Sequence, residues 1–81
     1  MWSEGTIGIN AFSEDKKTKV AHYWVKHFEE GSEFGIDEGR ISKMTIKIDG
    51  ETVVNYDRGW DIEPETEEAQ LAYMILLKQY N

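Results

Sequence analysis

The dipeptide Asp49-Gly50 constrains the fold of this chain more than any other feature of its sequence. It stands between two runs that alternate apolar and polar residues, residues 40 to 48 and residues 52 to 56. A type I′ turn needs a positive φ at both central residues, and Asp-Gly is one of the pairs that adopt it most readily. The pattern therefore predicts an antiparallel β-hairpin.

Two further strands are predicted before this hairpin. Residues 3 to 12 place apolar side chains such as Ile9 and Ala11 on one side, which is typical of a strand with one buried face. A polar loop at residues 13 to 17 separates this strand from residues 18 to 28, which are rich in strand-forming side chains.

The strand at residues 18 to 28 has apolar side chains on both faces, so two registers are open. One register exposes five side chains: Val20, His22, Trp24, Lys26 and Phe28. The other buries Trp24 and Phe28, and it exposes Tyr23, Val25 and His27. The large apolar surface of tryptophan favours the second register. After this strand, Gly31, Gly35 and Gly39 are expected to supply a positive φ where the chain reverses.

A C-terminal helix is predicted after Pro64. Thr66 is expected to cap its N-terminus, and Glu67 and Glu68 suit the positive end of the helix dipole. The apolar residues that follow lie on one broad stripe with a period of about 3.6 residues: Ala69, Ala72, Tyr73, Leu76, Leu77 and Tyr80. A four-stranded antiparallel sheet with one helix on one face gives an α+β two-layer sandwich, and residues 1 to 81 are predicted to form one domain.

The composition excludes several classes of protein. The chain has no cysteine, which excludes a disulfide framework, a thiolate metal site and a cysteine nucleophile. Its longest apolar stretch, residues 71 to 77, is far shorter than a membrane span. The first residues, Met1 to Glu4, lack the basic start and the apolar run of a signal peptide, so the expected location is the cytoplasm.

Negative charge is concentrated in two segments of a chain whose net charge is -7. Residues 29 to 38 hold five acidic residues and no basic one: Glu29, Glu30, Glu33, Asp37 and Glu38. Residues 57 to 68 also have a net charge of -5, whereas the rest of the chain is +3. Such a surface repels duplex DNA and attracts a basic protein surface, which is the predicted partner. The alternative is that these acidic side chains only keep a small domain soluble.

Residues 55 to 61 combine aromatic, acidic and arginine side chains within one predicted turn. Arg58 and Trp60 belong to the residue types enriched at protein-protein hot spots, so they are candidate anchors for the same partner. The structural alternative is that Arg58 pairs with Asp57 or Asp61 while Trp60 closes the end of the core. The carboxylates of this region do not match the spacing of a calcium loop, and no metal or cofactor is predicted.

Three apolar residues of the predicted helix, Leu71, Met74 and Ile75, fall outside its main stripe. Two interpretations are open. Either a loop such as residues 57 to 63 wraps over this flank of the helix, or the three side chains form a second interface, for example in a homodimer.

Enzyme chemistry has little support in the sequence. His22 and His27 stand five apart on one predicted strand and therefore point to opposite faces. The chain has no Gly-rich phosphate loop and no serine elbow. Asp57 and Asp61 could serve as the general acid and base of a small hydrolase, which is the weakest functional alternative. The chain is predicted not to be an enzyme.

Binding of single-stranded nucleic acid is the main alternative to a basic protein partner. If the strand at residues 18 to 28 exposes Trp24 and Lys26, these side chains lie beside Lys43 and Lys47 of another strand. Aromatic rings interleaved with lysines bind single strands by stacking and by phosphate contacts. The acidic net charge and the register that buries Trp24 argue against this alternative.

The segments Glu29 to Lys43 and Asn55 to Asp61, followed by Pro64, carry a resemblance that spans nearly the whole chain. The chain resembles a family of small proteins of unknown function from Firmicutes and their phages. The resemblance implies a phage or mobile-element origin, but no activity, ligand or site residue. Small acidic phage proteins often inhibit host machinery, including CRISPR nucleases. By this analogy the predicted function is to bind and inhibit a basic, nucleic-acid-handling host protein.

Overall fold

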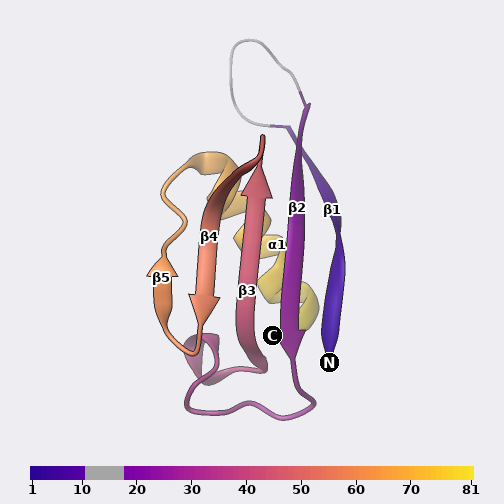
Figure 1. Ribbon diagram of the computed structural model, residues 1–81. Coiled ribbons are helices and arrows are strands. Elements are labelled where there is room, and N and C mark those ends of the chain that lie inside the picture. Colours follow the sequence, from indigo (N-terminus) through magenta and orange to yellow (C-terminus); the bar gives the residue numbers. More distant parts are fainter. Residues whose placement is uncertain (11–17) are drawn as a thin grey trace.

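The described residues, 1 to 10 and 18 to 81, form a five-stranded antiparallel sheet with one α-helix packed on one face (Figure 1). The structure is a computed structural model, and the last two residues of the first predicted strand, 11 and 12, and the predicted loop at residues 13 to 17 lie outside the described residues. The strands are β1 (Trp2–Asn10), β2 (Thr18–His27), β3 (Ile41–Ile48), β4 (Glu51–Asp57) and β5 (Trp60–Ile62). A short 3-10 helix, η1 (Ile36–Glu38), precedes β3, and the C-terminal helix is α1 (Glu67–Tyr80).

Each strand pairs with its neighbour in the chain, so the order across the sheet is β1-β2-β3-β4-β5. The predicted α+β class, with an antiparallel sheet and a C-terminal helix packed on it, is confirmed. The prediction of four strands is wrong, because the described residues include β5, which pairs Trp60 with Tyr56 and Ile62 with Asn55. β5 has only three residues and all are exposed, so it lacks the alternation by which a strand is recognised in a sequence.

The hairpin at Asp49-Gly50 is confirmed. The φ angles of the two residues are 52° and 78°, as a type I′ turn requires. The strands that it joins, β3 and β4, pair Met44 with Tyr56 and Ile46 with Val54. All four of these side chains are buried, so the hairpin supplies the centre of the core.

Helix α1 closes the core from one side of the sheet. Thr66 is its N-cap, as predicted, and its Oγ1 accepts a hydrogen bond of 3.1 Å from the backbone N–H of Ala69. Ala69, Ala72 and Leu76 are fully buried. Half-buried side chains pack around them at the margin of the core: Tyr73, Leu77 and Tyr80. No helix among the described residues is long and apolar enough to cross a membrane.

Of the two registers that the sequence left open for β2, the one favoured by burial of Trp24 is wrong and the other is observed. Tyr23 and Val25 are buried under α1, and Trp24 therefore lies on the opposite face of the sheet. Phe28, which was also expected in the core, follows the strand and is 47% exposed. His27 was expected on the exposed face, but it is half-buried on the side of α1.

The pairing of β2 with β3 explains this outcome. Val25 lies opposite Met44 and Tyr23 lies opposite Ile46, so the alternation of β3 decides which residues of β2 reach the core. This constraint between two strands outweighs the apolar surface that burial of Trp24 would remove from water.

The glycines between β2 and β3 have another role than the predicted one. The expected positive φ at Gly31, Gly35 and Gly39 is wrong, because the positive values in this segment occur at Asp37 (51°) and Glu38 (57°). Gly35 instead permits a close approach of two backbone segments, since a methyl group at this position would overlap the carbonyl oxygen of Gly39.

Candidate functional site

The face of the sheet opposite α1, which we call the outer face, carries the four residues of the alternative nucleic-acid site. Trp24 and Lys26 come from β2, and Lys43 and Lys47 come from β3. Figure 1 looks onto this face, with α1 behind the strands. The structure thus brings all four side chains onto one surface, because every second residue of a strand points to the same face.

Cross-strand pairing arranges the outer face in rows. One row joins Trp2, Lys26, Lys43 and Asp57 across β1, β2, β3 and β4. Lys26 and Lys43 are direct neighbours in this row, and like charges directly opposite each other destabilise a sheet. The Nζ of Lys43 lies 3.5 Å from Oδ1 of Asp57, whereas Lys26 has no ion pair among the described residues. The charge of Lys26 is therefore available to an external anion.

Aromatic rings lie next to these cations. Trp24 stacks on His22 with 4.2 Å between ring centroids and 17° between ring planes. The Nζ of Lys47 is 5.9 Å from the centroid of the Trp24 ring, and the Nζ of Lys26 is 5.9 Å from that of Trp2. A cation at this distance is attracted by the ring face, so rings and charges on this surface are held close together.

Two hollows open on the outer face. The larger has a volume of about 460 Å³ and is lined by Trp2, Trp24, Thr45 and Lys47. The second, of about 320 Å³, is lined among others by Lys26, Phe28, Phe34 and Arg58. Here the Nζ of Lys26 is 5.7 Å from the Phe28 ring, and the guanidinium of Arg58 is 4.8 Å from the Phe34 ring. Each hollow therefore combines aromatic rings with a cation.

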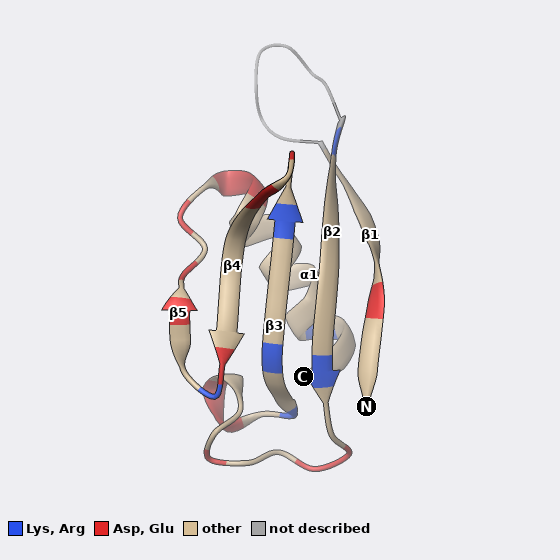
Figure 2. Ribbon diagram, viewed as in Figure 1, with Lys and Arg blue, Asp and Glu red and all other residues tan. Residues whose placement is uncertain are grey.

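Positive and negative charges separate across the molecule. Among the described residues Lys47 and Arg58 have no carboxylate within ion-pair distance. Figure 2 shows Lys and Arg in blue on β2 and β3, in the middle of the sheet. Most of the red acidic segments lie around β5, before α1, and in the connection between β2 and β3.

The predicted acidic cluster lies in this connection between β2 and β3. Its five side chains are all exposed: Glu29, Glu30, Glu33, Asp37 and Glu38. Within the described part of the chain none of them forms an ion pair. Two hydrogen bonds hold the connection in place: Tyr56 Oη donates to the carbonyl of Phe34 at 2.9 Å, and Asn81 Nδ2 donates to the carbonyl of Ile36 at 3.1 Å. The acidic side chains therefore project from an anchored loop.

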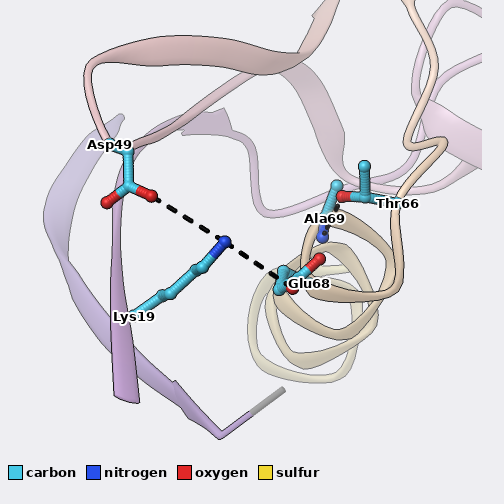
Figure 3. A network of polar contacts seen from close by, with 5 residues as sticks. All are labelled: Lys19, Asp49, Thr66, Glu68 and Ala69. Atoms are coloured by element: carbon cyan, nitrogen blue, oxygen red, sulfur yellow. Dashed lines mark hydrogen bonds and ion pairs between the residues drawn. The ribbon is translucent and has the colours of Figure 1, made fainter. Parts of the chain in front are cut away.

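The second acidic segment, residues 57 to 68, is partly neutralised by local contacts. Within this segment, Glu68 lies 3.8 Å from the Nζ of Lys19 and Asp57 lies 3.5 Å from the Nζ of Lys43. The Nζ of Lys19 also lies 3.8 Å from a carboxylate oxygen of Asp49, in the hairpin turn. Figure 3 shows Lys19 between the hairpin turn and the first turn of α1. Residues 29 to 38 are therefore the stronger acidic surface of the two.

Arg58 and Trp60, the two candidate anchors, are not brought together. Trp60 lies on the side of α1, where its ring packs edge-on against Tyr56 and Tyr73, with 5.0 Å and 5.4 Å between the ring centroids. Arg58 has a φ of 58° and lies over Phe34 instead. The structural alternative predicted that Arg58 pairs with Asp57 or Asp61, but among the described residues Arg58 forms no ion pair. It also predicted that Trp60 packs at the end of the core, and this part matches the contact of Trp60 with Tyr56.

The three residues outside the main helical stripe differ in exposure. Leu71 is half-buried against the core, whereas Met74 is 58% and Ile75 is 43% exposed. Trp60 of β5 packs against Tyr73 of α1. At about 100° per residue, Tyr73 lies on the flank of the helix opposite to Leu71 and Ile75, so this contact does not cover those two residues. An apolar flank of α1 therefore faces solvent in the described structure.

The two histidines point to opposite faces, as predicted. On the outer face, Nε2 of His22 is 2.9 Å from Oε2 of Glu4. On the side of α1, Nε2 of His27 is 3.0 Å from the hydroxyl of Ser3. Burial lowers the pKa of His27, and the positive charges of the amino terminus and of Arg40 lower it further. The two rings therefore cannot act on one substrate.

Asp57 and Asp61, the candidate acid and base of a hydrolase, have different partners. Asp57 pairs with Lys43, whereas Oδ2 of Asp61 accepts a hydrogen bond of 3.1 Å from the side-chain amide of Asn55. Among residues 1 to 10 and 18 to 81, no three His, Asp or Glu side chains are close enough together to hold a metal ion.

Sequence reasoning missed Trp2 and Phe34 as parts of the outer surface. Trp2 reaches it because β1 begins one residue earlier than predicted and pairs this residue with Lys26. Extending the alternation of β1 backwards by one residue would have placed Trp2 beside Thr6 on the exposed face. No signal in the sequence places Phe34 under Arg58, because that contact joins two loops.

Comparison with known proteins gives the chain a family but no activity. No curated protein and no solved structure matches it. A family model, described as a domain of unknown function (DUF7678), matches residues 1 to 81. The chain therefore belongs to the DUF7678 family.

Proposed function

We propose that the outer face binds a short stretch of single-stranded nucleic acid. The observation that carries this proposal is the row of directly opposed lysines, Lys26 and Lys43, next to the exposed ring of Trp2 and the half-buried ring of Trp24, which both line the same hollow. An anion between the two ammonium groups relieves their repulsion, and a base beside it stacks on an indole ring.

The size and openness of the surface suit single strands. Bases of a single strand are free to stack on aromatic side chains, and each such contact contributes about 1 to 3 kcal/mol. The hollow between Trp2 and Trp24 has a volume of about 460 Å³ and is bordered by Lys47, which can contact the adjoining phosphate. The rings serve as a platform for one or two bases, with the lysines as phosphate ligands.

The charge distribution limits the length of nucleic acid that the proposal allows. The net charge is -7, and the acidic loop at residues 29 to 38 adjoins the end of the outer face. A long or double-stranded nucleic acid would meet this loop and be repelled. Three lysines that contact phosphates predict a slope of log K against log salt of about -2 for a single strand.

Titration of the protein with short oligo-deoxythymidine and oligo-uridine at low salt tests the proposal through tryptophan fluorescence. We expect quenching that weakens as salt is added. Trp24→Ala should lower the affinity at least about tenfold through the loss of stacking, and Lys47→Glu should lower it through loss and reversal of a phosphate contact. Trp60→Phe removes the tryptophan on the other side of the sheet and should leave the quenching in place.

Lys78→Glu is the matched control for Lys47→Glu. Both substitutions change the net charge equally, but Lys78 lies on α1, away from the outer face. Wild-type emission that does not respond to either oligonucleotide would contradict the proposal. An equal loss of affinity in the two charge variants would also contradict it, because the attraction would then depend on net charge alone.

A second candidate function is binding of a basic protein through the acidic loop at residues 29 to 38. The observation that favours it is that this loop is anchored by Tyr56 and Asn81, while its carboxylates have no ion pairs among the described residues. In this proposal the loop competes with nucleic acid for the groove of a nucleic-acid-handling protein, as a phage-encoded inhibitor would.

Charge reversal tests the second candidate. Changing Glu29, Glu30 and Glu33 to lysine should abolish recovery of specific partners from a bacterial lysate, because attraction to a basic groove is lost. The control changes Glu63, Glu65 and Glu67 to lysine and shifts the net charge equally. If both triple variants recover the same proteins as the wild type, acidic steering is wrong.

A further inference from the structure

The two edges of the sheet differ in how they are protected against pairing with another strand. The edge strand β5 has three residues and is followed by Glu63 and Pro64, features that discourage further pairing. The edge strand β1 has nine residues, contains no proline or lysine, and pairs with β2 without a register shift. No described segment pairs with its free side.

The one charged side chain of β1 does not guard this edge. The carboxylate of Glu4 points to the neighbouring strand, where it lies 2.9 Å from Nε2 of His22. The described residues of β1 and β2 contain Glu4 as their acidic residue and Lys19 and Lys26 as basic ones, so this half of the sheet is slightly positive in an acidic chain. Two copies of the chain can therefore approach each other along β1 with less repulsion than along any other edge.

The backbone groups of alternate residues of β1 point away from the sheet. Met1 and His27 exchange two hydrogen bonds, of 2.9 and 3.0 Å, and therefore form a hydrogen-bonded pair. Because such pairs alternate along an antiparallel ladder, the odd-numbered residues of β1 bond to β2. The N–H and C=O groups of the even-numbered residues then face the free edge: Trp2, Glu4, Thr6, Gly8 and Asn10.

These free groups fit a second copy of the same strand. Thr6 is the central residue of β1, so a two-fold axis at Thr6 pairs the largest number of residues. In this register Glu4 lies opposite Gly8 of the second copy, and Trp2 lies opposite Asn10. No two like charges meet, and the glycine leaves room for the glutamate side chain.

Helix α1 contacts β1, and its exposed flank faces the half of the sheet formed by β1 and β2. Glu68 contacts Lys19 of β2, and Leu71 and Ile75 follow it on the helix at spacings of three and seven residues, so the three lie on one flank. Ile75 is 43% exposed, and Ile7 of β1 is half-buried. A second copy that extends the sheet at β1 covers these apolar side chains as well.

We infer that two copies of this chain associate through antiparallel pairing of β1 with β1 about Thr6, which joins their sheets and packs the two Leu71 and Ile75 flanks together. The association gives one continuous sheet with a helix from each copy on the same side. It is independent of the proposed nucleic-acid site, because the outer face stays open in the dimer.

Chemical cross-linking tests the register, and the absence of native cysteine makes the result specific. In Thr6→Cys the two positions lie opposite each other, about 5.5 Å apart between Cα atoms. In the control Glu4→Cys they are offset by four residues, about 13 Å along the strand. A short bifunctional maleimide should convert most of the Thr6→Cys protein to a covalent dimer and little of the Glu4→Cys protein. Equal cross-linking of both variants, or of neither, would overturn the inferred register.

Sedimentation equilibrium tests the association itself. Wild type should have twice the 9.4 kDa mass of the chain. Thr6→Pro removes an outward N–H and should give a monomer, and Ile75→Lys should weaken the dimer at least about tenfold by placing a charge in the contact. The matched control Met74→Lys, one residue before Ile75 on the helix, should leave the dimer intact. Circular dichroism shows whether each variant is folded. A wild type that stays monomeric at all concentrations, or a dimer broken by Met74→Lys and not by Ile75→Lys, would refute the inference.

Discussion

Replacing Leu76 with alanine should lower the free energy of unfolding by about 3 kcal/mol, within the range of about 2 to 5 kcal/mol for large-to-small core substitutions. Leu76 is the one large side chain of α1 that is fully buried, and the other two fully buried residues of the helix, Ala69 and Ala72, are small. Small neighbours on the helix cannot fill the space that the substitution leaves. Urea unfolding followed by circular dichroism measures the change.

Met74→Ala is the control for this prediction. It also shortens an apolar side chain of α1, but Met74 is 58% exposed, so the free energy of unfolding should change by no more than about 0.5 kcal/mol. A Leu76→Ala protein as stable as Met74→Ala would show that α1 does not close the core as described.

Gly35→Ala should lower the free energy of unfolding by about 2 to 3 kcal/mol, although it adds only one methyl group. The methyl group would overlap the carbonyl oxygen of Gly39 and approach that of Ile41. Both obstacles are backbone atoms, which cannot move aside as a flexible side chain can. The acidic loop would have to shift as a whole, and the hydrogen bond from Tyr56 to the carbonyl of Phe34 would weaken.

Gly59→Ala tests the same change where the structure has room. No atom lies within contact distance of a methyl group at Gly59, and this residue has no positive φ. Alanine there should be neutral or should stabilise the protein by up to about 1 kcal/mol, because it restricts the unfolded chain. Equal effects at Gly35 and Gly59, measured by thermal or urea unfolding, would contradict the close approach of Gly35 to Gly39.

The parts of the fold that sequence alone predicted depend on local signals. The Asp49-Gly50 turn demands positive φ at two successive residues, and Thr66 caps the helix by a contact with Ala69, three residues later. β5 has no local signal of this kind. Its three residues become a strand because β4 offers them a partner, which is a property of the sheet and not of the segment.

The face of β2 could not be predicted from β2 itself. Both faces of the strand carry large apolar side chains, so within β2 only the size of Trp24 favours the burial of one face over the other. The observed choice follows from the pairing of Val25 with Met44 and of Tyr23 with Ile46, residues that are about twenty positions apart in the sequence.

In the candidate site, too, local patterns predict some residues, whereas contacts between distant segments place the others. Once a register is assumed, the alternation of side chains along each strand is enough to predict that four residues share one face of the sheet: Trp24, Lys26, Lys43 and Lys47. Trp2 and Phe34 could not be added, because one reaches the surface through pairing of β1 with β2 and the other through a contact between two loops.

Helix α1 follows strands β1 to β5 along the chain, and this order has a consequence for the synthesis of the protein. Ala69, Ala72 and Leu76 emerge from the ribosome after all the strands that they cover. Until then no helix covers the side chains of β3 and β4 that are buried in the folded protein, such as Ile46 and Val54, and these side chains remain in contact with water. A nascent chain paused before residue 67 is therefore the species most prone to aggregate or to recruit a chaperone, and the folded domain appears only after the last turn of the helix has been made.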